Sequence, residues 1–153
     1  MIEGGALEGL QIFIRPETGG LKPQVQFHDL QEIYSINKWR KIAGKGEDYP
    51  LQIRSNTWLM DTRLEEGHET EFPNDNSYNI ASLFYLMKGK IQVNEDTIIT
   101  SGESVLVENE SPVFKALETS DIVLFTTQTD ATYFEEGMYS GNQKQLVAQR
   151  SVI

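Results

Sequence analysis

The stretch 84–114, FYLMKGKIQVNEDTIITSGESVLVENESPVF, contains three short apolar runs separated by turn residues. The first run ends at Lys88-Gly89, the second ends at Asn94-Glu95-Asp96, and the third follows Ser101-Gly102-Glu103. Glycine and asparagine accept the positive φ angles of tight turns, so this rhythm is typical of β-hairpins. The stretch therefore predicts successive strands of a small β-barrel, and it contains no histidine and no cysteine.

The same rhythm continues on both sides. Leu10, Ile12 and Ile14 alternate onto one face of a predicted N-terminal strand, and a longer strand is predicted from Trp58 to Leu64. Further strands are predicted at 24–27, 41–43, 51–53, 83–87, 91–93, 97–99, 105–107, 113–117 and 122–125, with short helical turns at 29–36 and 143–149. Many short strands indicate an all-β fold, an antiparallel barrel or sandwich. We expect an N-terminal strand and linker over 1–36, the barrel over 37–127 and a polar tail over 128–153.

Length and composition limit the possible functions. The 153 residues suffice for one domain with a real core. A net charge of −10 argues against binding to nucleic acid or to an anionic membrane surface. The absence of cysteine excludes disulfides, thiolate catalysis and cysteine-bound zinc. No apolar stretch approaches the roughly 18 residues of a membrane span, and the N-terminus lacks an export signal, so we expect a cytoplasmic protein.

Two motifs resemble the cupin family. They are LFYLMKGKIQVN at 83–94, with Gly89 after the strand, and ITSGESV at 99–105, with Gly102-Glu103 before the next strand. The segments 9–16 and 20–23 are similar to the connection between the two halves of pirin-like bicupins, and 58–67 is similar to the strand that opens their C-terminal cupin. Together these motifs cover roughly residues 5–127. The chain thus resembles the C-terminal, quercetinase-type cupin, a jelly roll.

The resemblance also shows what is missing. Metal cupins carry a His-x-His pair, a glutamate and a further histidine, and family spacing places these at Asn76, Tyr78, Ser82 and Val113. None of these residues suits a transition metal. In pirin-like bicupins the metal and the proposed flavonol dioxygenase activity belong to the N-terminal cupin. The resemblance therefore implies a domain with no metal, no cofactor and no catalytic residues of its own.

The two histidines offer weaker alternatives. His68 precedes Glu71 by three residues, a spacing that could suggest a metal site, but it follows a turn glycine and is interpreted as a solvated residue at the rim. His28 beside Asp29 could form the acid–base dyad of a metal-free sugar epimerase or isomerase. Adjacent residues of an extended chain point apart, however, so this pair is poorly arranged for proton transfer.

Apolar residues suggest two further sites. Trp58, Met60, Phe84 and Phe114 either line a small-molecule pocket or simply fill the barrel. Leu10, Ile12 and Ile14 form a row that either contacts a partner or folds back onto its own barrel. The partner would be a second copy, giving a homodimer, or an N-terminal cupin half.

The favoured hypothesis is a metal-free cupin module for structure, assembly or ligand sensing. The alternative is a part of a quercetin 2,3-dioxygenase-type enzyme whose metal site lies in a separate N-terminal cupin.

Overall fold

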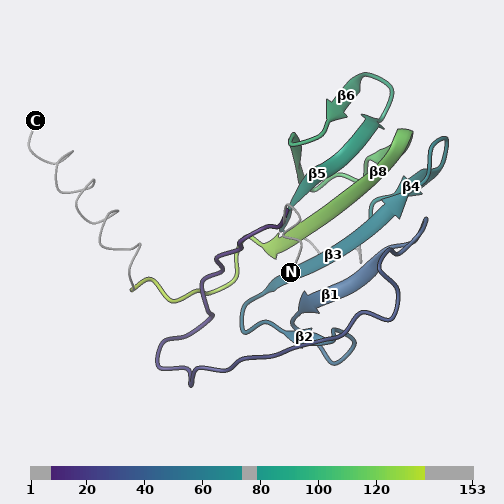
Figure 1. Cartoon of the computed structure of the whole chain (residues 1–153). Coiled ribbons are helices and arrows are strands. Elements are labelled where there is room, and N and C mark those ends of the chain that lie inside the picture. Colours follow the sequence, from purple (N-terminus) through teal and green to yellow (C-terminus); the bar gives the residue numbers. More distant parts are fainter. Residues whose placement is uncertain (1–7, 74–78, 137–153) are drawn as a thin grey trace, which may run out of the picture.

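The computed structural model describes residues 8–73 and 79–136, which form eight strands and no helix (Figure 1). The strands are β1 (Arg40–Gly44), β2 (Leu51–Gln52), β3 (Thr57–Leu64), β4 (Glu69–Glu71), β5 (Ile80–Val93), β6 (Thr97–Thr100), β7 (Ser104–Glu108) and β8 (Val113–Gln128). The predicted all-β, cupin-type fold is confirmed. The helix predicted at 143–149 lies outside the described residues.

All eight strands belong to one sheet, in the order β2-β1-β3-β8-β5-β6, with β4 paired to β8 and β7 paired to β5. Within this fold class the sheet has two particular features. It does not close into a barrel, and β2 runs parallel to β1. A turn between Gly46 and Tyr49 places Leu51 beside Ala43. β2 then runs in the same direction as β1, so the two strands pair in parallel.

Two long strands, β5 and β8, replace four of the predicted short ones. The runs 83–87 and 91–93 both belong to β5, so Lys88-Gly89 does not end a strand. Instead the pairing of β5 with β8 shifts register between Leu86 and Ile91, where Gly89 has a φ of 99°. Such a bulge inserts an extra residue and exchanges the faces of the residues that follow. The buried positions accordingly change from 82, 84 and 86 to 91 and 93.

The bulge is closed by Ser120 of β8. The Ser120 hydroxyl accepts a hydrogen bond from the Lys90 N–H at 3.1 Å, and it lies within 2.6 Å of the carbonyl oxygen of Glu118. A Cβ added to Gly89 would lie 2.2 Å from the Ser120 Oγ and 2.6 Å from the carbonyl oxygen of Thr119. Glycine is therefore required at position 89 by its φ angle and by the close approach of β8.

The core lies between the two halves of the folded sheet. Its buried members are Leu64, Phe72, Phe84, Leu86, Ile91, Val93, Ile99, Val107, Phe114, Ala116, Ile122 and Leu124. Phe84 pairs across the strands with Leu124, and Phe114 pairs with Val93, yet the rings of Phe84 and Phe114 stack with centroids 4.0 Å apart. This contact between residues that are not strand partners joins the two halves across the interior.

The turn that follows β6 is as expected. Gly102 has a φ of 86°, and Glu103 accepts hydrogen bonds from the Thr100 N–H at 2.6 Å and from the Thr100 hydroxyl at 3.0 Å. These two hydrogen bonds hold the pKa of the Glu103 carboxyl below its usual value. A charged Glu103 thus caps the turn between β6 and β7.

The N-terminal strands predicted at 10–14 and 24–27 are wrong, because neither segment joins the sheet. Ile12 and Ile14 lie instead against the outer face of β3 and β8, beside Leu59 and Phe125. Further along, the Gln26 side chain pairs with the backbone of Gln52 through two hydrogen bonds of 2.9 Å. Side-chain contacts therefore attach this part of the chain where backbone pairing was expected.

The helical turns predicted over Asp29–Ile36 are also wrong. The carbonyl oxygen of Glu32 accepts a hydrogen bond from Arg40 at 2.6 Å, and that of Ser35 accepts one from the Arg63 N–H at 2.9 Å. An α-helix would use these carbonyls for its own N–H groups. Because β1 and β3 engage them, the segment lies flat along the sheet.

The bulge generates the first prediction. Gly89→Ala should lower the free energy of unfolding by about 3 kcal/mol or more, through strain at positive φ and collision with Ser120. Gly67→Ala is the matched control, since Gly67 also has a positive φ of 83° but open space around its Cα. The control should lose only about 1 kcal/mol. Urea denaturation measures both, and equal losses would contradict a packing role for Gly89.

Candidate functional site

A cavity of about 480 Å³ opens on the inner side of the sheet. Its lining comes from β1, the β1–β2 connection, β3, β8 and the residues around β4 and β5. These residues are Lys41, Lys45, Asp48, Tyr49, Trp58, Met60, Phe72, Pro73, Ile80 and Thr126. The size is within the range of small-molecule sites, which is roughly 300–1,000 Å³.

One wall of this inner cavity is apolar. Trp58 and Met60 alternate with outward-facing residues along β3, so both point to the inner side. The Trp58 indole N–H donates a hydrogen bond to the carbonyl oxygen of Lys45 at 2.9 Å, which fixes the ring. A flat apolar group could stack here.

The rim formed by β1 and the β1–β2 connection carries charge. Lys41 donates a hydrogen bond to the carboxylate of Asp48, and this contact lowers the pKa of the Asp48 carboxyl. The ammonium of Lys41 also lies 5.1 Å from the centre of the Tyr49 ring. Lys45 pairs with Glu17 of the N-terminal segment at 2.6 Å. The rim can hold a polar group of a ligand, but among the described residues that line it there is no nucleophile with an adjacent base.

Two of the four aromatic and sulfur residues considered for a pocket lie elsewhere. Trp58 and Met60 line the inner cavity, whereas Phe84 and Phe114 are fully buried and stack in the core.

The family's metal-ligand positions can be located in part. Ser82 is 1% exposed, and its hydroxyl lies 3.1 Å from the Thr126 hydroxyl. Val113 begins β8 and is 40% exposed. Asn76 and Tyr78 lie outside the described residues. Within 8–73 and 79–136 no three His, Cys, Asp or Glu side chains come together as a metal site would require.

The histidines lie apart from the inner cavity. His28 and Asp29 are both exposed on the N-terminal segment, and neither lines the inner cavity. His68 is exposed in the turn after Gly67, where its backbone bonds to Glu65 and Ala116. These positions give no buried carboxylate to orient an imidazole.

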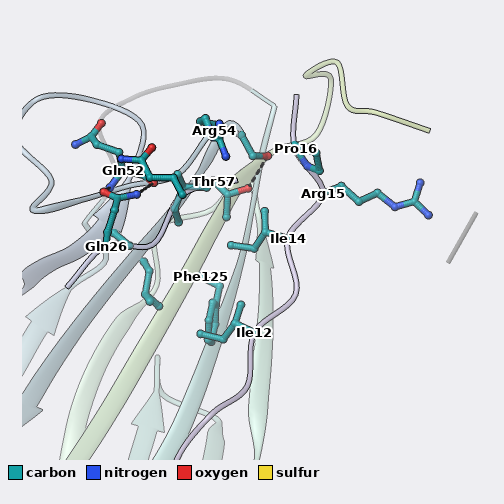
Figure 2. A pocket seen from close by; sticks show the side chains of 14 residues that line it. Ile12, Ile14, Arg15, Pro16, Gln26, Gln52, Arg54, Thr57 and Phe125 are labelled. Carbon is teal, nitrogen blue, oxygen red and sulfur yellow. Dashed lines mark hydrogen bonds between the residues drawn. The ribbon is translucent and has the colours of Figure 1, made fainter. Parts of the chain in front are cut away.

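The outer side of the sheet carries a second hollow, which Figure 2 shows. Ile12 and Ile14 of the N-terminal segment border it, with Phe125 of β8 beneath them. The residues predicted to form an interface remain partly exposed to solvent: Leu10 and Ile12 are each 41% exposed and Ile14 is 38% exposed. The row thus faces its own sheet on one side and solvent on the other.

A larger apolar group was missed by the sequence analysis. We call it the exposed apolar set, and it consists of Val25, Phe27, Leu30, Ile33 and Ile36. Phe27 is 91% exposed, Ile33 80% and Val25 77%. The sequence shows these residues as spaced apolar positions, but the spacing predicts a strand at 24–27 and helical turns at 29–36, with their apolar faces inside the fold.

The comparisons with known proteins give a family and a fold. Residues 42–126, more than half of the chain, match the model of the quercetinase C-terminal cupin domain. No curated protein matches the chain. Among the part of the chain that the structure describes, no helix is long and apolar enough to cross a membrane.

Solved structures share the architecture at low sequence identity. Bacterial pirin YhhW from Escherichia coli in complex with nickel(II) is 14% identical, with a TM-score of 0.61 over 74% of this chain and 47% of that chain. Quercetin 2,3-dioxygenase from Acinetobacter baumannii is 17% identical, with a TM-score of 0.55 over 74% of this chain and 42% of that chain. The chain therefore spans less than half the length of these structures.

The expected resemblance is confirmed by both comparisons. With its folded eight-stranded sheet and the family match over 42–126, the chain belongs to the quercetinase C-terminal cupin domain family.

Proposed function

We propose that this cupin domain is a non-catalytic assembly module that pairs with a second cupin domain through the exposed apolar set. The observation that carries the proposal is the exposure of Phe27, Ile33 and Val25. Apolar side chains of this size gain about 1.5–3 kcal/mol each when they are buried. Several of them in one short segment mark a contact surface better than scattered single residues do.

The segment that carries these side chains is held in place. Gln26 is attached to Gln52 of β2, and the guanidinium of Arg40 binds the carbonyl oxygens of Glu32 and Ile33 at 2.6 and 3.3 Å. Arg40 is itself fixed by two hydrogen bonds to Asp61, at 2.9 and 2.5 Å. A surface whose backbone is already ordered loses less conformational entropy when a partner binds.

The length of the relatives suggests the nature of the partner. The chain covers 47% of the pirin structure and 42% of the dioxygenase structure, so each contains a further part of similar size. The partner we propose is a second copy of this chain, which would supply a domain of that size. Leu10, Ile12 and Ile14 would add their exposed edges to the contact.

The proposed association can be measured by sedimentation velocity. We expect the wild-type chain to have a dimer mass at protein concentrations of about 50 µM, in the µM range typical of modest interfaces. The double substitution Phe27→Asp and Ile33→Asp should shift the mass to that of a monomer, because it places charges in the contact.

Ile98→Asp is the control, since Ile98 is 53% exposed on β6 at the other end of the strand order. It should remain dimeric. A monomeric wild-type protein, or a dimer that survives both charges, would contradict a self-association surface at the exposed apolar set.

The proposal also holds that this chain binds no transition metal of its own. Ser82 and Val113 offer a hydroxyl and an alkyl group where metal cupins have carboxylate and imidazole, and carbon or a neutral hydroxyl is a poor ligand for these ions. After incubation with iron, nickel or zinc and gel filtration, elemental analysis should find far less than one metal ion per chain. About one tightly held ion would overturn this part of the proposal.

A second candidate function is supported by the likeness to the longer quercetin 2,3-dioxygenase structure. In this alternative the chain is the metal-free part of a flavonol-oxidising assembly, and a separate cupin domain holds the metal. The isolated chain should then consume no oxygen with quercetin, because flavonol oxidation by oxygen needs a redox cofactor. Oxygen-electrode traces check this, and turnover that survives chelation but is lost in His28→Ala or His68→Ala would place the chemistry in this chain.

A further inference from the structure

The outer cavity has a volume of about 390 Å³ and lies under the N-terminal segment, on the face of the sheet opposite the core. Residues 12–16 and 24–26 form one side, and the β2–β3 connection forms the other. Figure 2 shows that the two ends of the cavity differ in character. The Ile12 and Phe125 side chains lie at one end, and Arg54, Gln26 and Gln52 lie at the other.

The apolar end is built from the pairing of β3 with β8. Leu59 and Phe125 are direct partners across these strands, so their side chains stand together on the outer face. Ile12 and Ile14 contact this end from above and remain 41% and 38% exposed. An apolar group inserted here would cover surface that the chain itself leaves partly open.

The polar end is held by reciprocal hydrogen bonds. The Gln26 amide nitrogen donates to the carbonyl oxygen of Gln52, and the Gln52 N–H donates to the Gln26 amide oxygen, both at 2.9 Å. The Glu17 N–H donates to the carbonyl oxygen of Arg54 at 2.8 Å, which fixes the backbone from which the arginine projects. The wall of the cavity at this end is therefore ordered without a ligand.

Arg54 differs from the arginines of the neighbouring strands. Arg40 and Arg63 each bind one aspartate through two hydrogen bonds. Arg54 donates to the carbonyl oxygen of Lys22 at 2.9 Å, and no carboxylate of residues 8–73 or 79–136 forms an ion pair with it. The carboxylate of Glu17, whose backbone N–H binds the Arg54 carbonyl oxygen, pairs with Lys45 instead. A guanidinium has five N–H donors, so Arg54 retains donors for an anion.

We infer that the outer cavity binds a small monocarboxylate with an apolar body. The carboxylate accepts hydrogen bonds from the guanidinium of Arg54, and the body lies against Phe125 and Leu59. In a protein of net charge −10, a cation with no acidic partner provides a local site for an anion. The cavity is formed by one chain; Ile12 and Ile14 at its apolar end also belong to the proposed contact, whereas Arg54 does not.

The experiment uses 3-phenylpropionate as the probe and 3-phenylpropionamide as its uncharged counterpart. Amide resonances of the full chain are followed by NMR during titration with each compound. The carboxylate should shift the resonances of Arg54, Ser55, Thr57 and Phe125. It should bind about three- to tenfold more tightly than the amide, the range expected for a partly solvated charge-assisted contact.

Arg54→Gln should remove the difference between the two compounds. It should leave the fold intact, because the Arg54 side chain is exposed. Arg15→Gln is the matched control: Arg15 borders the same cavity, but its side chain extends outward and its guanidinium lies 5.5 Å from the centre of the Tyr133 ring. The control should bind both compounds as the wild type does.

Three results would overturn the inference. The first is no binding of the carboxylate, or shifts confined to other parts of the sheet. The second is equal affinity for the carboxylate and the amide in the wild type. The third is an Arg54→Gln variant that retains the preference for the carboxylate, or an Arg15→Gln variant that loses it.

Discussion

The contact between Gly89 and Ser120 determines how the rest of the sheet is arranged. Between the Leu86–Ile122 and Ile91–Ala116 pairs β5 advances by five residues while β8 advances by six, and the β5 side chains that face inward change from even to odd positions. Ile91 and Val93 are buried only because of this change. Without it, Lys90 and Gln92 would face the core, and burying those charged and polar groups without partners would be unfavourable.

The same arrangement separates the two sides of the sheet. The inner side is filled by the Phe84–Phe114 stack and its neighbours, and it opens into the inner cavity near Trp58 and Met60. The outer side holds the charged residues Asp61, Arg63 and Asp121 together with the N-terminal segment. Arg63 joins these components, because it binds Asp121 through two hydrogen bonds and its guanidinium lies 3.2 Å from the centre of the Tyr34 ring. The core therefore supplies stability while the outer face remains available for contacts.

A strand was predictable from the sequence wherever apolar and polar residues alternate and turn residues mark its ends. Thr57–Leu64 is such a case. The continuity of β5 was not predictable. A Lys-Gly pair suits a bulge as well as a hairpin turn, and only the pairing with the neighbouring strand decides between the two. Trp58 and Phe84 were equivalent as apolar strand residues, but the depth of each in the folded sheet depends on residues far away in sequence. The exposed apolar set was missed because periodicity reports which side chains share a face and not whether that face is covered.

The hydrogen bonds between Gln26 and Gln52 also affect how the chain meets other chains. β2 is an edge strand of the sheet, and edge strands tend to pair with strands of other molecules. Gln26 occupies both backbone groups of Gln52 with a side chain, which cannot extend the ladder any further. Growth of the sheet into a filament is therefore blocked at this residue, and contacts made through side chains can remain limited to a closed, finite complex.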